Sequence, residues 1–339
     1  MSASAANQQP TPVRIFQMLN AFQQTEALRA AIDLDVFTQL SDGPLSASAL
    51  GKRIGAAPKG ARVLCDYLTI AGLLNKEQDK YSLTPEAQIF LSKKSPAYIG
   101  SATQFMCSDY HLRNFSSLAD AVRRGGSAVN ESSTSVENPM WVDFARGMAP
   151  LRVPAAEFTA KLVGADQQKP MKVLDIAASH GLFGITIAKH NSKAEVVAVD
   201  WRPVLDVAKE NAAKAGVQNR YKTIAGSAFE VDFGNGYDVA LVTAFLHHFD
   251  VATNEKFLRK VHGALKPGGV VATLEFVPNE DRVTPPHAAG FALIMLSNTE
   301  AGDAYTFREL DQMFRNAGFG KSELHSNANS IDQVIITKK

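Results

Sequence analysis

The feature that most constrains the fold is an alternation of strand and helix patterns that begins after about residue 155. Short runs of β-branched and small apolar residues predict strands, and the segments between them have helical spacing. Repeated strand–helix units predict an α/β, Rossmann-like domain with a parallel sheet between two layers of helices, whose ligands bind beyond the carboxyl ends of the strands. The expected strands span residues 173–176, 195–199, 221–225, 238–243, 270–275 and 332–337, and the expected helices span 183–189, 204–215, 254–265 and 307–317.

The preceding part of the chain, residues 12–91, has the pattern of short helices followed by a hairpin. This order is typical of a winged helix, a fold that often binds DNA. Basic and acidic residues nearly balance here and the expected third helix carries no basic stripe, which disfavours DNA as a partner. The apolar first helix, Val13–Phe22, needs a surface to cover it, so we expect an interaction module that forms a homodimer.

The length of 339 residues is consistent with two domains. We expect a disordered tail over residues 1–11, a winged-helix-like dimerisation domain over 12–100, a helical connector over 101–155 and the Rossmann-like domain over 156–339. The connector is rich in aromatic and methionine side chains. These side chains predict one wall of a substrate pocket, although core packing would also explain them.

Composition excludes several other classes of protein. Charged residues make up 20% of the chain and the formal net charge is +1, so a nucleic-acid partner is not expected. No apolar run approaches the roughly 20 residues that cross a bilayer, and the polar N-terminus does not resemble a signal peptide. The two cysteines, Cys65 and Cys107, are expected to be reduced core thiols of a cytoplasmic protein.

A turn of small residues, Asp175–Gly181, follows the first expected strand. Such a turn lets the backbone approach a ligand and presents the N-terminus of the next helix. Ala177 and Ser179 occupy positions where nucleotide-binding folds usually have glycine, and this suits a pyrophosphate poorly. S-adenosylmethionine carries no phosphate, so the turn favours this methyl donor over NAD. Asp200 ends the second strand, where its carboxylate is placed to accept hydrogen bonds from ribose hydroxyls.

These and later motifs occur in the order found in class I methyltransferases, which the sequence resembles. With the N-terminal part included, the chain is similar to the dimeric small-molecule O-methyltransferases of plant phenolic and bacterial polyketide or carotenoid pathways. The resemblance implies S-adenosylmethionine as cofactor, S-adenosylhomocysteine as product, no metal and a small-molecule acceptor. The motifs are Val173–Gly181, Val199–Asp200, Gly226–Phe229, Phe245–Phe249 and Ala264–Gly269.

For the donor, the resemblance implies that the first turn holds the methionine portion, that Asp200 binds the ribose and that Trp201 lies beside the adenine. Ser227 stands where an aspartate commonly contacts the adenine amino group, and Thr243 replaces a donor-contacting lysine. The donor-binding residues expected on these grounds are Asp175, Ala177, Ser179, Gly181, Asp200, Trp201, Ser227, Ala228, Phe229 and Thr243.

For the chemistry, the resemblance implies His247 as general base and Glu275 as the carboxylate that orients it. A second family glutamate matches Ala304, and Asp303 and Tyr305 are the two candidate substitutes beside it. The pocket residues expected to contact the acceptor are Phe105, Met106, Trp141, Phe144, Met148, Phe291, Ile294 and Met295.

A histidine suits this reaction because a phenol with a pKa near 10 must lose its proton at neutral pH. A thiol, with a pKa of about 8.5, needs less help, so S- or N-methylation stays an alternative. Two further alternatives are a winged-helix regulator that uses the donor as an effector and a cofactor-assisted reaction without methyl transfer. A zinc site is disfavoured because no cysteine or second histidine lies at ligand spacing from His247 or His180.

Overall fold

A computed structural model describes residues 10–129, 140–327 and 331–339 of the chain. The chain divides into two compact units, residues 1–103 and 104–339, and each is described by itself. Most of the tail predicted over residues 1–11 lies outside the described residues. From residue 104 on, the predicted connector belongs to the same unit as the large sheet.

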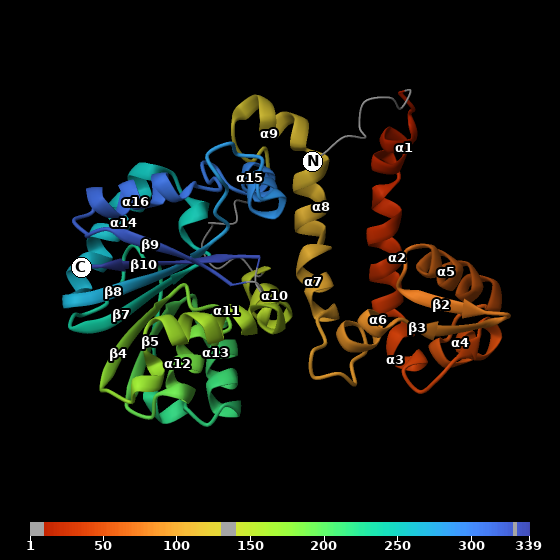
Figure 1. Ribbon diagram of the computed structural model, residues 1–339, viewed down its shortest axis with the longest axis horizontal. Helices are drawn as coiled ribbons and strands as arrows, with labels where there is room; N and C mark the ends of the chain where they lie inside the picture. Colours follow the sequence, from red (N-terminus) through yellow and green to blue (C-terminus); the bar gives the residue numbers. More distant parts are fainter. Residues whose placement is uncertain (1–9, 130–139, 328–330) are drawn as a thin grey trace, which may run out of the picture. The chain divides into compact units, whose positions relative to one another are not determined.

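The unit of residues 104–339 contains a seven-stranded sheet with the order β6-β5-β4-β7-β8-β10-β9 (Figure 1). The first five strands in this order are parallel, which confirms the predicted α/β fold class. The strands are β4 (Met171–Ile176), β5 (Ala194–Asp200), β6 (Tyr221–Ala225), β7 (Tyr237–Thr243), β8 (Leu265–Glu275), β9 (Ser322–Ser326) and β10 (Gln333–Lys338).

The last two strands differ from the prediction of a parallel sheet. β10 pairs antiparallel with both β8 and β9, and β9 was not predicted. The connection from β9 to β10 is too short for the crossover of a dozen or more residues that parallel neighbours need, so the two strands form an antiparallel pair. β8 also begins earlier than predicted, with a register irregularity against β7 between Tyr237 and Val239.

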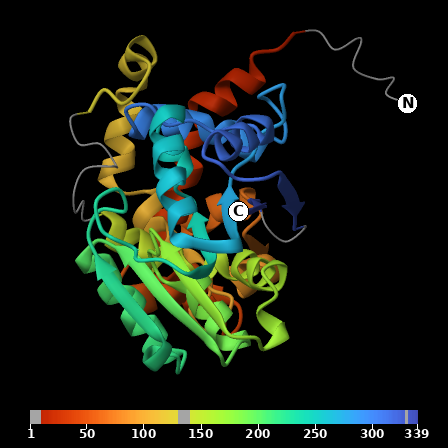
Figure 2. The ribbon, with the colours of Figure 1, turned by 90° about the vertical axis from the view of Figure 1, so that its left-hand side faces the viewer.

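Helices cover both faces of this sheet. α12 and α13 lie on one face and α14 and α16 on the other (Figure 1), and α14 (cyan) crosses the sheet in Figure 2. Each face has its own apolar core, one containing Ile187 and Leu205 and the other Phe257 and Phe314. The helices of this unit include α8 (Asp109–Ser116), α9 (Leu118–Arg124), α10 (Met140–Gly147), α11 (Ala149–Leu162), α12 (Leu182–His190), α13 (Arg202–Lys214), α14 (Val251–Ala264), α15 (Pro286–Asn298) and α16 (Phe307–Asn316).

The unit of residues 1–103 is mainly helical and has a small antiparallel sheet of order β1-β3-β2. The predicted helix-then-hairpin order is present, and Tyr81 and Phe37 are in its core. Its elements are α1 (Val13–Leu19), α2 (Ala21–Asp33), α3 (Val36–Leu40), β1 (Leu45–Ser46), α4 (Ala47–Ile54), α5 (Pro58–Ile70), β2 (Leu74–Glu77), β3 (Lys80–Leu83) and α6 (Pro85–Phe90); α7 (Thr103–Met106) runs across its boundary.

The predicted continuous helix Val13–Phe22 is wrong at one point, because it breaks at Asn20 between α1 and α2. The Asn20 amide donates a hydrogen bond of 3.0 Å to the Phe16 carbonyl oxygen, a local bond that competes with helix continuation. The apolar side chains Phe16, Leu19 and Phe22 are all more than half exposed. α1 therefore presents the uncovered apolar surface that the sequence predicts.

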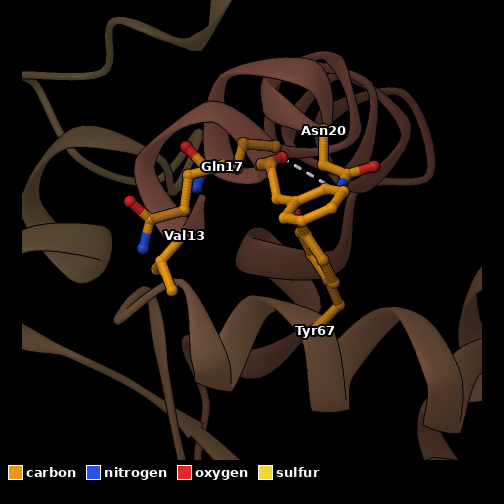
Figure 3. Close-up of a pocket in the computed structure, with 6 residues that line it drawn as sticks. Val13, Gln17, Asn20 and Tyr67 are labelled. Atoms are coloured by element: carbon orange, nitrogen blue, oxygen red, sulfur yellow. Dashed lines mark hydrogen bonds between the residues drawn. The ribbon is translucent and has the colours of Figure 1, made fainter. Parts of the chain in front are cut away.

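A pocket of about 330 Å³ lies between α1 and α5 (Figure 3). Val13, Gln17 and Asn20 line it from the α1 side, and Tyr67 lines it from α5 (Figure 3). Apart from Tyr67, its lining carries no titratable side chain, and it continues the apolar surface of α1.

Neither cysteine lies in a disulfide, but their surroundings differ. Cys65 is fully buried, and burial raises the pKa of its thiol to about 11. Cys107 is only partly buried, so the prediction of two core thiols is wrong for this residue. Among the described residues, none of the helices is long and apolar enough to span a membrane.

Candidate active site

The turn after β4 has the backbone of a glycine-rich turn although it has lost glycines. Ala177 and Ser179 adopt positive φ angles of 53° and 52°, and Gly181 has φ 72° where it precedes α12. Non-glycine residues are strained in this region by roughly 1 kcal/mol each. Ala177 and Ser179 therefore keep the backbone conformation that glycine would favour at these positions. The turn still presents its backbone to a ligand.

Asp200 at the end of β5 is tied to this turn. Its carboxylate accepts hydrogen bonds from the backbone N–H of Ser179 at 2.8 Å and of Trp201 at 2.7 Å. Burial raises the pKa of the Asp200 carboxyl to about 6, and the two backbone hydrogen bonds oppose this shift. A carboxylate can accept about four hydrogen bonds, so Asp200 keeps capacity for the hydroxyls of a ribose.

Three buried polar atoms around the turn have no hydrogen-bond partner among the described residues: Asp175 Oδ1, Ser179 Oγ and the Tyr221 hydroxyl. Such groups are costly unless a ligand or water satisfies them. The space is narrow, because a Cβ added to Gly181 would lie 2.5 Å from the Tyr221 hydroxyl oxygen. Tyr221 begins β6 and was not predicted as a site residue, since a lone tyrosine at a strand start gives no signal in the sequence.

The predicted adenine segment, Ser227–Phe229, follows β6. Phe229 packs against Phe249, with ring centroids 4.9 Å apart, and against Phe257 at 5.5 Å. Trp201 packs instead beside α10 and α13, in the small cluster that contains Ala145. Thr243 is buried at the end of β7.

The His247–Glu275 pair forms the most distinctive feature of the site. His247 lies in a 3-10 turn after β7 and Glu275 is the last residue of β8, and both are about 95% buried. The distance from His247 Nδ1 to Glu275 Oε2 is 2.5 Å. Because an ionised carboxylate only accepts, Nδ1 carries the proton and Nε2 keeps its lone pair.

The other oxygen of Glu275 is also fixed. Oε1 accepts hydrogen bonds from the backbone N–H of Phe245 at 3.1 Å and of Leu246 at 2.8 Å. The Glu275 carboxylate thus joins three consecutive residues of the turn, and the His247 ring cannot rotate without breaking a buried charge-assisted bond.

His248 is next to the base but has a different environment. Its ring centroid lies 4.3 Å from that of His247 and 5.4 Å from that of Trp141. Its Nδ1 has no partner in the described part of the chain. Burial, and then the electrostatic effect of the neighbouring His247, keep the pKa of His248 well below its usual value, so His248 is neutral.

Aromatic side chains from several elements lie around His247 and His248. The edge of Phe291, on α15, meets the His247 ring at 4.8 Å, and Phe276 stacks on Phe291 at 4.0 Å. On α10, Phe144 contacts Trp141 at 5.6 Å and Phe105 at 4.9 Å. The predicted connector therefore contributes a second group of rings.

The other predicted pocket residues have different exposures. Met148 and Met295 are buried and Ile294 is partly buried, whereas Met106 is 59% exposed. Sequence reasoning missed His111, whose Nδ1 lies 3.1 Å from Asn298 Oδ1 and whose ring contacts Phe105 at 4.6 Å.

His180, in the first turn, is held between aromatic rings. Its ring is nearly parallel to those of Phe144, at 6.5 Å, and Phe183, at 6.2 Å. The Leu182 N–H donates to its Nδ1 at 3.1 Å. Burial, and then the positive charge of Arg152, lower the pKa of His180 to about 3, so its ring is neutral and does not act as a base near pH 7.

Among the described residues, neither candidate substitute for the glutamate that Ala304 replaces bonds to His247. Ala304 is buried, and the Asp303 carboxylate accepts from Arg282 at 3.3 Å. The Tyr305 hydroxyl donates to the Phe249 carbonyl oxygen at 2.5 Å. In the described residues both candidate substitutes are thus engaged away from His247. Within residues 10–129, 140–327 and 331–339 there is also no group of three His, Cys, Asp or Glu side chains that could hold a metal.

Comparison with known proteins agrees with this geometry. Residues 16–93 match a family model for the O-methyltransferase dimerisation domain, and residues 173–269 match one for a methyltransferase domain. A Nostoc punctiforme protein classed as an O-methyltransferase is 48% identical to this chain. The match covers 98% of this chain and 100% of the chain in that crystal structure, with a TM-score of 0.94. The chain belongs to the O-methyltransferase family.

Two other proteins that the chain resembles are more distant. The 3-hydroxy-5-methyl-1-naphthoate 3-O-methyltransferase of Streptomyces sahachiroi is 27% identical, over 91% of this chain and 89% of that protein. Human N-acetylserotonin methyltransferase, solved in complex with S-adenosylmethionine, is 21% identical over 99% of both chains, with a TM-score of 0.84. At this lower identity the structural match shows a shared fold.

Proposed function

We propose that this O-methyltransferase transfers the methyl group of S-adenosylmethionine to a hydroxyl of a small hydrophobic or aromatic acceptor. The observation that carries the proposal is the buried His247–Glu275 pair, which leaves His247 Nε2 as a fixed proton acceptor. A phenolic or enolic hydroxyl needs such a base, because its anion is the nucleophile.

The residues around the first turn fit the donor. The orphaned atoms Asp175 Oδ1 and Ser179 Oγ, and the remaining capacity of Asp200, would hold its polar methionine and ribose portions. Ser227–Phe229 would flank its adenine. When bound, S-adenosylmethionine supplies an activated methyl group on a sulfonium.

The chain's own contribution is alignment, proton transfer and exclusion of water. Glu275 holds the His247 ring in one tautomer and stabilises the imidazolium after the acceptor proton moves to Nε2. The rings of Phe144 and Phe291 offer flat apolar surfaces to an aromatic acceptor. No metal is required in this scheme.

Transfer to sulfur is the second candidate, and one observation favours it. Ala304 stands in place of a second glutamate, and among the described residues Glu275 is the one carboxylate that bonds to His247, which suits an acceptor that loses its proton easily. We also infer a homodimer, formed through a dimerisation domain over residues 12–100, which the match of residues 16–93 supports. A cytoplasmic location, expected from the low cysteine count, stays a prediction.

The experiment combines donor binding with an acceptor screen. Calorimetric titration with S-adenosylhomocysteine should show one site per chain, and hydroxynaphthoates should be methylated in preference to aryl thiols and amines. His247→Ala should lower kcat about 10²–10⁴-fold and leave the Kd for S-adenosylhomocysteine within about twofold. No binding by the wild-type chain, or full activity of His247→Ala, would refute the proposal.

Glu275→Gln gives a sharper test of the base. If the glutamine oxygen accepts from Phe245 and Leu246, its amide group faces His247 Nδ1 and forces the proton onto Nε2. The wrong tautomer then removes the base, and kcat should fall about 10³–10⁴-fold with little change in donor affinity. Glu275→Gln at wild-type kcat would contradict the assigned tautomer.

A further inference from the structure

Lys260, on α14, makes three interactions with a single turn of the chain. Its ammonium Nζ donates to the Ala228 carbonyl oxygen at 2.9 Å and to the Val231 carbonyl oxygen at 2.6 Å. It also lies 4.2 Å from the centroid of the Phe233 ring. All three partners lie in residues 228–233, which overlap and follow the proposed adenine-flanking residues Ser227–Phe229.

The side chain is partly buried, and burial lowers the pKa of the Lys260 ammonium while Asp232 and Glu230 oppose the shift. An ammonium removed from water is stable only when its donors are satisfied. Lys260 therefore has a defined position, unlike a lysine that moves freely on the surface.

The turn that Lys260 holds is anchored at its other end to Asp200. The Gly226 N–H donates to the Asp200 carbonyl oxygen at 3.0 Å, with Gly226 at φ 140°. The Ser227 carbonyl oxygen then accepts from the N–H groups of Glu230 and Val231, both at 3.0 Å. The turn is thus fixed between the proposed ribose-binding residue and α14.

The way in which this turn can recognise adenine depends on Ser227. Where an acidic side chain would accept from the 6-amino group with its charge, a serine hydroxyl offers a weaker contact, and Ser227 Oγ already accepts a hydrogen bond from the Phe229 N–H at 3.3 Å. Recognition then relies on the backbone groups of Ser227–Phe229, and backbone hydrogen bonds weaken steeply with small displacements.

From these contacts we infer that Lys260 is a positioning residue that sets the backbone of Ser227–Phe229 for reading the adenine of the donor. This inference rests on the proposed function and adds a residue to it. Lys260 touches neither reacting atom, so it should affect donor affinity and not the methyl-transfer step.

The experiment replaces Lys260 with methionine, which has similar length and no donors. In Lys260→Met, the Kd for S-adenosylhomocysteine and the KM for S-adenosylmethionine should rise about tenfold, the equivalent of one charge-assisted hydrogen bond, with kcat within about twofold. S-inosylhomocysteine, in which oxygen replaces the 6-amino group, is the second probe. The ratio of the Kd for S-inosylhomocysteine to the Kd for S-adenosylhomocysteine measures the preference for adenine over hypoxanthine. This ratio should be severalfold smaller in Lys260→Met than in the wild type and should recover in Lys260→Arg.

Lys256→Met is the matched control, because Lys256 is exposed on the same helix; this variant should behave as wild type. Unchanged affinity and base preference in Lys260→Met would overturn the inference. An equal loss of both ligands together with a lower Tm would also overturn it, since that pattern indicates only a stabilising role. Failure of the wild-type chain to bind S-adenosylhomocysteine would instead refute the proposed function.

Discussion

At the scale of single residues, Asp175 shows how burial couples the donor site to stability. Its Oδ2 accepts from the Gly184 N–H at 3.1 Å, and its Oδ1 has no partner among the described residues. Burial raises the pKa of the Asp175 carboxyl to about 8 and the charge of Asp200 adds to the shift, whereas the Gly184 hydrogen bond opposes it. The folded chain therefore keeps a proton at neutral pH that the unfolded chain releases above its usual pKa of 3.8.

This difference predicts a pH dependence. Because the Asp175 pKa is higher in the folded chain, the free energy of unfolding falls as pH rises from about 4 to about 8. The slope is up to about 1.4 kcal/mol per pH unit. Relative to Asp175→Asn, which keeps an acceptor for Gly184, the wild type should lose free energy of unfolding across this window. Urea unfolding at pH 5, 6, 7 and 8, followed by the fluorescence of Trp141 and Trp201, measures it. A constant difference between the two chains would contradict the raised pKa.

The roles of residues at strand ends could be predicted where the family motifs cover them, whereas contacts outside those motifs could not. His247 and Glu275 were predicted as a pair, and the structure brings them to 2.5 Å. Tyr221 and Lys260 were missed, because their partners come from other elements whose approach no local pattern records. The positive φ angles of Ala177 and Ser179 were also not predictable from residue type, since tertiary contacts override the preference of both residues.

At the scale of elements, the loop after α15 packs against the backbone of His247, the proposed base. A Cβ added to Gly302 would lie 2.2 Å from the His247 carbonyl oxygen and 2.6 Å from Thr299 Oγ. Gly302→Ala should therefore displace His247, destabilise the chain by about 1–3 kcal/mol and lower kcat by up to about 10²-fold. Thermal unfolding and steady-state kinetics measure both effects.

Gly290→Ala, within α15 itself, is the control for this prediction. No atom lies within 4 Å of the Cβ that it would add. It should be neutral or stabilise the helix by about 0.5–1 kcal/mol at wild-type kcat. If both alanines behave alike, the loop does not support the base.

The elements themselves were predicted best where the pattern is local and repeated. β4, β5, β6 and the helices between them follow the predicted ranges closely. The antiparallel direction of β10 was not predicted, because this largely buried strand has the apolar run that is typical of a parallel strand. The break at Asn20 was missed because the apolar spacing continues across it.

At the scale of the whole molecule, the apolar surface of α1 and α2 predicts that the chain is a dimer. Phe16 and Phe22 are 59% and 63% exposed, an unfavourable arrangement for large apolar side chains unless a partner covers them. The double variant Phe16→Asp, Phe22→Asp should be monomeric by light scattering at micromolar concentration, where the wild type is dimeric. A monomeric wild type would contradict the prediction, and unchanged S-adenosylhomocysteine binding by the variant would show that the donor site remains folded.

The strand order of the large sheet also has a consequence for how such enzymes diversify. Most of the proposed donor-binding residues follow β4, β5 and β6, on one side of the point where strand order reverses, whereas the proposed base follows β7 and its carboxylate ends β8 on the other side. Mutations that remodel the acceptor side can therefore accumulate without rebuilding the nucleoside side. An ancestral chain could change its acceptor while keeping its methyl donor, so the two specificities are free to evolve at different rates.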